Sequence, residues 1–362
     1  MLSPFRRPGS GIKGFYYPAA AIVAALFVTG VIFVIMGFNP VRVFGSLVNG
    51  AIGNKNSVGE TLVKATPLIF MALSFAVSVQ CGIFNLGANG QLYIGAIAGT
   101  LVGTGFPFLP PGVHIPLVLL AGIAGGGIYG ALAGWLHNRF GVNELIATIM
   151  LNNIAAQITA WCVAGPMKDP LIAAVSTPQS ALLPRSVKFP VILPGTRLHA
   201  GLLLAVLSIA AFYLFLWKTA KGYEMRVVGL NPQAARYAGM NVKSNHLLAM
   251  FLAGALAGMG GCVELMSVQG RLIPMFAGEI GFDGVAVSLL GANTPGGITA
   301  AALLFGMLSS GAGKMQMLAK VPNAAVFIMK GLIILFVVGR ELFSFGLAAP
   351  GRRKPARGTD AA

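Results

Sequence analysis

The stretch FYYPAAAIVAALFVTGVIFVIMGF, from Phe15 to Phe38, contains no charged residue. At about 24 residues it is long enough to cross the roughly 30 Å hydrocarbon core of a bilayer as an α-helix. A removable signal peptide has a shorter apolar core followed by a small-residue cleavage site, and this stretch lacks both features. We therefore expect a membrane anchor that is retained in the mature chain.

The composition of the whole chain also indicates a membrane protein. Of its 362 residues, 56% are hydrophobic and 9% are charged, whereas a soluble domain has about 25% charged residues. These numbers exclude a soluble globular surface, and the high hydrophobicity excludes a disordered chain. The net charge of +16 would indicate nucleic-acid binding in a soluble protein. Here most basic residues lie between apolar runs, so we interpret them as membrane-surface charges and expect no nucleic-acid partner.

Nine further apolar runs follow the first one, and together they predict an all-α polytopic membrane protein. About ten transmembrane helices are expected, with eight or nine as the alternative. One run of seven residues, Val285–Gly291, is too short to cross a bilayer unless it extends or forms a short re-entrant segment. The runs are Thr61–Val79, Gln91–Gly105, Ile115–Leu136, Leu145–Ala164, Gly201–Trp217, Leu247–Val268, Val285–Gly291, Ile298–Ala312 and Ala324–Gly339.

Lysine and arginine predict the orientation, because cytoplasmic segments of membrane proteins are enriched in them. Basic residues gather in residues 1–14, 218–245 and 341–362. If all three segments are cytoplasmic, six spans precede the middle segment and four follow it, which agrees with ten spans. We therefore expect a cytoplasmic N-terminal tail, a single transmembrane domain over 15–340 with a cytoplasmic loop at 218–245, and a basic cytoplasmic C-terminal tail. The basic residues of 165–200 do not follow this rule.

An internal similarity suggests an inverted repeat. The segment Gly141–Asn153 can be aligned with Gly281–Asn293, which pairs the two glycines, Asn143 with Asp283, and Asn153 with Asn293. Each copy follows a helix with a ridge of glycines. With ten spans the two copies begin on opposite sides of the membrane, a common plan for transporters. Chance similarity between two small-residue helices is the alternative.

Polar residues interrupt the apolar runs at three places: 84–91, 143–144 and 291–297. Irregular backbone is tolerated at membrane depth only where protein or water covers it, so these interruptions indicate a translocation path. Amide side chains form hydrogen bonds without the cost of a buried charge, which favours a small neutral, hydroxyl-rich solute. Phe282 either stacks on the solute or packs in the protein. The candidate path residues are Asn85, Asn89, Gln91, Asn143, Asn152, Asn153, Phe282, Asp283 and Asn293.

Two charged residues, Glu264 and Lys330, fall inside predicted spans, and intramembrane charge is costly unless it is functional or paired. They could pair with one another, either to lock two helices or to serve transport. The three cysteines lack metal-ligand spacing. Ser310–Met315 lacks the first glycine and the Ser or Thr of a phosphate-binding loop. We therefore expect no metal, no cofactor and no catalytic residues, and hence no ATP hydrolysis by this chain.

The segment 218–245 contains a short helix with clear ends. Asn231 is a favourable N-cap residue, Pro232 suits the first helical position, and Gly239 is expected just beyond the helix. A helix of about two turns does not persist alone in water. It therefore needs a partner surface, to which Tyr237 and Met240 could contribute apolar contacts.

Gln233-Ala234-Ala235 followed by Gly239 resembles the Glu-Ala-Ala-x-x-x-Gly signature of permease subunits of bacterial ABC importers. Three other stretches look like the branch of that family that serves nucleosides and simple sugars: Phe84–Gln91, Gly141–Glu144 and Gly281–Gly284. The four stretches are spread from about residue 80 to 295. The chain is most similar to the longer permease of a nucleoside importer.

The resemblance implies a multi-pass protein of the bacterial inner membrane that translocates nucleosides or a related simple sugar. It implies a second permease, identical or different, and an ATP-binding subunit with two nucleotide-binding halves that drives transport. An external substrate-binding lipoprotein delivers the solute. Gln233 replaces the acidic residue of the signature, so a charge contact with the ATP-binding subunit is either absent or supplied elsewhere. The residues expected to couple the chain to that subunit are Pro232, Gln233, Ala234, Ala235, Arg236, Gly239 and Met240.

Two other readings remain open at this point. An ion-driven secondary transporter also favours inverted repeats, and it would work without an ATP-binding partner. A permease for ribose-type sugars or branched-chain amino acids would share the ATP-driven mechanism and differ only in cargo. The amide-lined path does not separate these cargoes.

Overall fold

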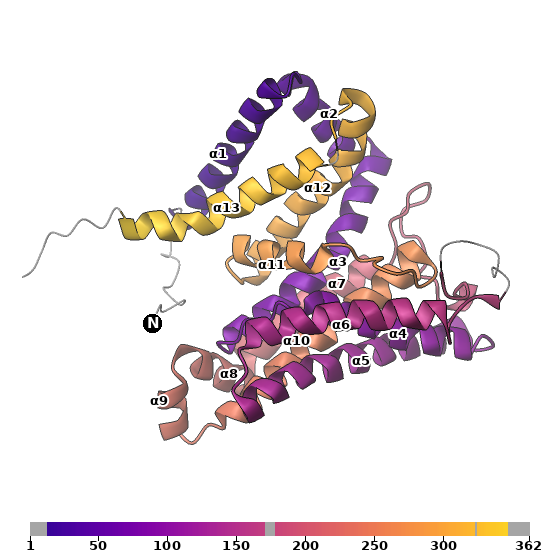
Figure 1. Ribbon diagram of the computed structural model, residues 1–362, viewed down its shortest axis with the longest axis vertical. Helices are drawn as coiled ribbons and strands as arrows, with labels where there is room; N and C mark the ends of the chain where they lie inside the picture. The colour runs from indigo at the N-terminus through magenta and orange to yellow at the C-terminus, as the bar shows by residue number, and fades with distance from the viewer. Residues whose placement is uncertain (1–12, 171–177, 323, 347–362) are drawn as a thin grey trace, which may run out of the picture.

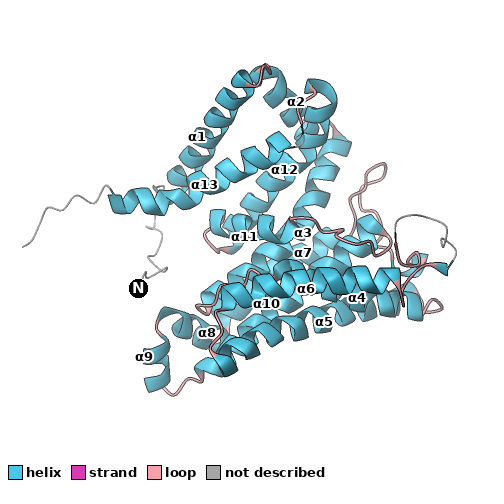
Figure 2. Ribbon diagram, viewed as in Figure 1, coloured by secondary structure: helices cyan, strands magenta, loops and turns pink. Residues whose placement is uncertain are grey.

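The computed structural model describes residues 13–170, 178–322 and 324–346, and the regular elements in this part of the chain are helices (Figure 2). Two isolated β-bridges, Lys168 with Ser180 and Val191 with His199, lie in the connection between α6 and α7. The helices are α1 (Lys13–Ile35), α2 (Pro40–Ile52), α3 (Lys55–Gln80), α4 (Ala88–Gly105), α5 (Pro111–Phe140), α6 (Glu144–Ala164), η2 (Arg185–Val187), α7 (Gly201–Lys218), α8 (Ala220–Leu230), α9 (Pro232–Tyr237), α10 (Val242–Glu264), η3 (Leu265–Gln269), α11 (Ile280–Leu290), α12 (Pro295–Ala319) and α13 (Ala324–Gly346).

Six of the described helical segments are long and apolar enough to cross a membrane: α3, α5, α6, α7, α10 with η3, and α12. Shorter apolar helical stretches are found at Val23–Ile35, Ile280–Leu290 and Ala324–Phe336. The prediction of a helical polytopic membrane protein is therefore confirmed. The number of spans and the side of the termini stay predictions.

The helices form two groups that share α3 (Figure 1). One group contains α4, α5, α6 and α10, and the other contains α1, α2, α12 and α13. Helix α3 packs against α10 in the first group and against α11 and α12 in the second. In its most apolar part 89% of the residues are buried, so α3 is the central helix of the described chain.

The two glycine-ridged helices of the internal similarity, α5 and α10, pack directly against each other. A Cβ atom added to Gly126 would lie 2.7 Å from the Cα of Gly258, and one added to Gly130 would lie 3.0 Å from the Cα of Gly254. Gly122 also contacts Gly258. Because rising numbers on α5 meet falling numbers on α10, the helices are antiparallel. Small residues permit this close approach of two backbones in a membrane protein.

The two aligned copies differ in local structure. Asn143 is the N-cap of α6, whereas its counterpart Asp283 lies in the first turn of α11. Helix α6 continues past Asn153 to Ala164, whereas α11 ends before Asn293. The inverted repeat therefore stays a prediction, supported by the antiparallel contact of the two glycine ridges.

Several elements were not predicted from the sequence. The helix α2 contains Arg42 and Asn49 among its apolar residues, so it forms no continuous apolar run. The segment η3 is a π-helix that directly continues α10, and the two together reach from Val242 to Gln269. The short apolar run Val285–Gly291 belongs to a longer helix, α11, that starts at Ile280.

Candidate translocation and coupling sites

The interruption at 84–91 forms the link between α3 and α4, and its amide side chains pair with one another. Asn85 Nδ2 donates to Gln91 Oε1 at 2.9 Å, and Gln91 Nε2 donates to Asn85 Oδ1 at 3.1 Å. Asn85 Oδ1 also accepts from the backbone N–H of Gly87 at 2.9 Å. Both amides are buried. They fix the entry into α4, where backbone N–H groups have no partner within the helix.

Two further amides tie this link to neighbouring helices. Asn152 of α6 accepts from the N–H of Gly90 at 2.7 Å and donates to the carbonyl of Leu86 at 2.8 Å. Asn89 accepts from the N–H of Gly281 at 2.8 Å and donates to the carbonyl of Gly278 at 3.1 Å. The link between α3 and α4 is therefore held against both α6 and the start of α11.

The remaining predicted path residues lie closer to the surface. Asn143 is exposed and accepts from the N–H of Leu145, and Asn153 is exposed and donates to the carbonyl of Ile149. Asn293 accepts from the hydroxyl of Ser288 at 2.8 Å. The ring of Phe282 is 42% exposed. The structure thus brings Asn85, Asn89, Gln91 and Asn152 together and places Asn143 and Asn153 on an exposed face.

One aromatic residue of this region was missed by the sequence reasoning. Phe84 immediately precedes Asn85, is 39% exposed, and packs at an angle against Phe75 of α3 with ring centroids 6.2 Å apart. The available signal was an apolar residue at the start of an amide-rich interruption. This signal is weak, because phenylalanine is also common in the flanking apolar runs.

The pairing of the two intramembrane charges differs from the pairing considered from the sequence. Lys330 of α13 forms its ion pair with Asp283 of α11, with Nζ 2.6 Å from Oδ2. Its ammonium group also lies over the ring of Phe305 of α12 at 6.0 Å. Glu264 is buried near the end of α10 and accepts from Gln269 Nε2 at 3.4 Å. The idea that Glu264 pairs with Lys330 is therefore wrong, because a nearer carboxylate faces the lysine.

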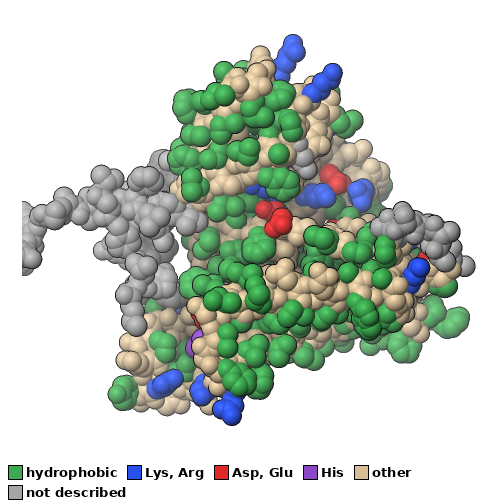
Figure 3. All heavy atoms as spheres, viewed as in Figure 1, with side chains coloured by type: hydrophobic (Ala, Val, Ile, Leu, Met, Phe, Trp, Pro, Cys, Tyr) green, Lys and Arg blue, Asp and Glu red, His purple; other side chains and the backbone are tan. Residues whose placement is uncertain are grey.

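The surface view shows where charges gather on one face of the molecule. Acidic and basic side chains lie together in the indentation between the two groups of helices, while hydrophobic side chains cover much of the rest of that face (Figure 3). Hydrophobic cover is expected where a helix faces lipid, and charges gather where they are paired or reach water.

The second candidate region projects from one end of the bundle as α8 and α9 (Figure 1). Asn231 is the N-cap of α9, as predicted, and its Oδ1 accepts from the N–H groups of Gln233 at 3.0 Å and Ala234 at 3.1 Å. Gly239 follows α9 with a φ of +79°, a conformation that glycine adopts without strain. The predicted ends of this short helix are therefore confirmed.

Helix α9 presents most of its side chains to the surroundings. The side chains of Gln233 and Arg236 are exposed, and Tyr237 is 94% exposed. Ala235 is buried and its carbonyl accepts from the N–H of Met240 at 2.9 Å. Ala235 and Met240 therefore hold α9 on its own chain, while its outer face has no cover from the described residues.

Hydrogen bonds join α8 to the start of α10 beneath this helix. Glu224 Oε2 lies 2.8 Å from Lys221 Nζ and accepts from Asn245 Nδ2 at 3.3 Å. Hydrogen bonds from Lys221 and then Asn245 lower the pKa of Glu224, so this carboxylate is ionised at neutral pH. Asn138, at the end of α5, donates to the carbonyl of Lys243 at 2.8 Å, so the end of α5, the first half of α8 and the start of α10 lie together.

Comparison with known proteins agrees with the membrane fold. Residues 57–338 match the family described as branched-chain amino acid transport system / permease component. A guanosine ABC transporter permease of Bacillus subtilis is 37% identical over 91% of this chain and 94% of its own length. A nucleoside ABC transporter permease of Lactococcus lactis is 35% identical over 88% and 89%. A glucose ABC transporter permease of Haloferax volcanii is 34% identical over 90% and 87%.

The family match spans most of the chain, and several relatives exceed 30% identity over nearly all of it. The chain therefore belongs to the family of branched-chain amino acid-type permease components of ABC transporters. It is a multi-pass protein of the cell membrane and a transport component. Members of this family work with an ATP-binding subunit and a substrate-binding protein.

Proposed function

We propose that this chain is the permease subunit of an ATP-driven nucleoside importer. Two of its relatives carry guanosine or nucleoside in their names and match nearly the whole chain. A simple sugar is the second candidate cargo, because one relative is named as a glucose permease and a nucleoside itself contains a sugar. ATP hydrolysis takes place in the partner, since this sequence has no complete phosphate-binding loop.

The observation that carries the proposal is the uncovered outer face of α9. A six-residue helix does not persist alone in water, and tyrosine and arginine are among the residues that most often contribute strongly to protein interfaces. We assign contact with the ATP-binding subunit to Tyr237 and to the predicted coupling residues, which are Pro232, Gln233, Ala234, Ala235, Arg236, Gly239 and Met240. Ala235 acts indirectly by holding the helix in place.

The orientation and the partners follow from this role. Residues 218–245 form the cytoplasmic coupling loop of a single transmembrane domain over 15–340, and both tails, 1–14 and 341–362, are cytoplasmic. One permease chain supplies one half of a pore, so a second permease completes it. The ATP-binding subunit has two nucleotide-binding halves, and an external lipoprotein delivers the solute. The tails lie largely outside the described residues.

The translocation path runs beside the link between α3 and α4. Asn85, Asn89, Gln91 and Asn152 support it from behind as a rigid layer, because each is buried and hydrogen-bonded within the protein. Phe282 and Phe84 are partly exposed there, and an aromatic face can stack on a nucleobase. Asn143, Asn153, Asp283 and Asn293 complete the proposed path.

Uptake into proteoliposomes tests the proposal directly. The chain is reconstituted with the ATP-binding subunit, second permease and lipoprotein encoded by its neighbouring genes, and labelled guanosine uptake is measured with and without ATP. Uptake should require ATP, be blocked by vanadate and be outcompeted by excess nucleosides. Uptake that persists without the ATP-binding subunit and collapses with ionophores would instead indicate an ion-driven transporter. Competition by glucose alone would assign the cargo to the sugars.

Charge reversal on α9 tests the coupling role. Arg236→Glu should lower uptake about tenfold or more, because a basic interface residue then carries the opposite charge. Membrane insertion and yield should not change, since Arg236 is exposed. The matched control is Arg185→Glu in η2, at the opposite end of α5, where Ser186 contacts His114. Equal uptake by the two variants would remove α9 from the coupling mechanism.

A further inference from the structure

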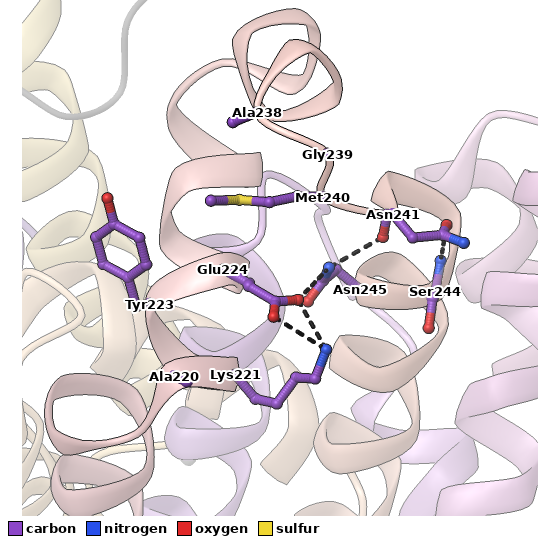
Figure 4. Close-up of a pocket in the computed structure, with 10 residues that line it drawn as sticks. All are labelled: Ala220, Lys221, Tyr223, Glu224, Ala238, Gly239, Met240, Asn241, Ser244 and Asn245. Atoms are coloured by element: carbon purple, nitrogen blue, oxygen red, sulfur yellow. Dashed lines mark hydrogen bonds and ion pairs between the residues drawn. The ribbon is translucent and has the colours of Figure 1, made fainter.

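A pocket of about 480 Å³ opens beneath α9 (Figure 4). Its walls come from the start of α8, from the turn between α9 and α10, and from the first turn of α10. Glu224 and Lys221 lie on one side and Asn245 on the other, and the Met240 side chain runs across the space above the carboxylate (Figure 4). The proposed function uses Gly239 and Met240 of its lining but gives no role to Glu224, Lys221 and Asn245.

The floor of the pocket combines the partly exposed carboxylate of Glu224 with the buried amide of Asn245. Asn245 is 3% exposed, and its Nδ2 donates to Glu224 Oε2 and to the carbonyl of Asn241 at 2.9 Å. Asn245 Oδ1 is buried and accepts no hydrogen bond from the described residues. A buried acceptor without a donor is uncommon in a folded protein. The floor therefore combines a carboxylate with an acceptor that lacks its partner.

Charge makes Glu224 distinctive in this part of the chain. It is the only acidic residue of 218–245, a segment that also contains Lys218, Lys221, Arg226, Arg236 and Lys243. A cation that approaches the segment is repelled by most of its surface and attracted at one place. That place already holds Lys221, whose side chain is 63% exposed and only three residues away on the same helix. Such exposed pairs are weak and exchange readily.

We propose that the pocket receives a basic side chain of the ATP-binding subunit, whose cationic group replaces Lys221 at Glu224. The stem of an arginine or lysine would pack along Met240, as long basic side chains do on apolar surface. A guanidinium has enough N–H groups to serve both Glu224 and the unpartnered oxygen of Asn245. The inference rests on the proposed function, because it names a specific contact with the same partner.

The contact would link the partner directly to the centre of the bundle. Glu224 is hydrogen-bonded to Asn245 on α10, and α10 packs against α3, α4 and α5. A movement of the partner's cation would thus act on α10 through two polar contacts. It would also supply the acidic contribution to the interface that the neutral Gln233 of α9 lacks.

Two variants of the same ion pair test the inference in the complete reconstituted complex. Glu224→Gln keeps the shape and the hydrogen bond from Asn245 but removes the charge, and it should weaken binding of the ATP-binding subunit about tenfold and lower ATP-dependent uptake in parallel. Lys221→Met frees Glu224 and should leave binding unchanged or make it tighter. Yield and elution volume in detergent check that both variants fold.

The results separate the possible roles. If both variants weaken binding equally, the pair only stabilises α8, and the inference is overturned. Wild-type behaviour of Glu224→Gln overturns it as well. A defect of Glu224→Gln that is seen only in vesicles with amine headgroups also overturns it, because the cation in the pocket would then come from a lipid. A defective Glu224→Lys chain that is rescued by an Arg or Lys→Glu change in the ATP-binding subunit would establish the contact. If even the wild-type chain binds no ATP-binding subunit, the proposed function itself fails.

Discussion

At the scale of single residues, buried amides solve a problem that any interrupted membrane helix meets. Backbone groups at membrane depth cannot turn to water, so they must find partners within the protein. Asn152 satisfies one N–H and one carbonyl of the link between α3 and α4 with its two amide atoms, and Asn85 satisfies another N–H. The interruption is therefore a built feature of the fold rather than a local failure of the helix.

Breaking the ion pair between Asp283 and Lys330 should destabilise the protein strongly. Asp283→Asn leaves the mostly buried Lys330 ammonium without its counter-charge, and we expect the free energy of unfolding to fall by about 3–5 kcal/mol. The double variant Asp283→Asn/Lys330→Met should recover most of this loss, because no unpaired charge remains. Thermal unfolding in detergent measures both effects.

The control for this experiment is an exposed pair of the same chain. Glu60 and Arg197 lie 3.8 Å apart and are both at least partly exposed, so Glu60→Gln should cost less than about 1 kcal/mol. If Asp283→Asn is as mild as Glu60→Gln, the ion pair between α11 and α13 contributes little to stability.

Acidification should destabilise the connection between α6 and α7 through His199. Burial, and then the charge of Arg197, lower the pKa of His199 from 6.5 to about 4. The folded chain resists protonation that the unfolded chain accepts, so the contribution to stability is complete above pH 6.5 and is lost as the pH falls toward 4. The loss reaches about 3 kcal/mol at most.

His199→Phe removes the titrating group and keeps a ring that can stack on Phe189. This variant should therefore lose less stability than the wild-type chain between pH 6.5 and 4, as measured by thermal unfolding in detergent at a series of pH values. Identical pH profiles would show that His199 does not contribute to acid sensitivity.

At the scale of elements, the crossing of α5 and α10 depends on the absence of side chains. Gly258 lies against Gly95 of α4 as well as against Gly122 and Gly126 of α5, so three helices meet at this glycine. Close approach gives membrane helices van der Waals contact in place of the hydrophobic effect, which lipid does not supply between helices.

A single methyl group at this crossing should be harmful. Gly258→Ala should lower the free energy of unfolding by about 1–3 kcal/mol, because backbone rather than a movable side chain faces the new carbon atom. Gly258→Leu should prevent the crossing and reduce yield. The matched control is Gly313→Ala in α12, where a Cβ atom meets nothing within 4 Å, and it should be neutral or slightly stabilising. Comparable losses for the two alanine variants would contradict the packing argument.

At the scale of the whole molecule, η2 and α9 mark the two opposite ends of the helix bundle. The contact of Ser186 with His114 places η2 near the start of α5. The end of α5 lies beside the start of α10, which directly follows α9 in the chain. These two elements therefore lie at opposite ends, and under the proposed function α9 is cytoplasmic and η2 is external.

Cysteine labelling in intact cells tests this orientation. All three natural cysteines are buried, so the wild-type chain should react little with a membrane-impermeant maleimide. Arg185→Cys should be labelled from outside, whereas Tyr237→Cys should be labelled only after the cells are opened. External labelling of Tyr237→Cys would reverse the topology and separate α9 from any cytoplasmic partner.

The apolar runs of the sequence predicted most of the long helices, because burial in lipid needs a continuous apolar stretch whatever its neighbours are. The capping residues Asn231 and Gly239 likewise predicted the ends of α9 from local chemistry alone. The helix α2 was missed because it mixes polar and apolar residues. The partner of Lys330 could not be predicted, since it depends on which helices become neighbours in three dimensions. The pocket around Glu224 could not be predicted for the same reason, because it joins Glu224 to Asn245, 21 residues further along the chain.

The contact between α5 and α10 also bears on how the protein is made. Val118 and Cys262 touch across this crossing although they are 144 residues apart in the chain. At a translation rate of about 5–20 residues per second, α5 leaves the ribosome roughly 7–29 s before α10 can meet it. During that interval α10 has not yet been made and does not pack against the glycine ridge of α5. The close packing of α5 against α10 is therefore established late in synthesis, after most of the chain has been made.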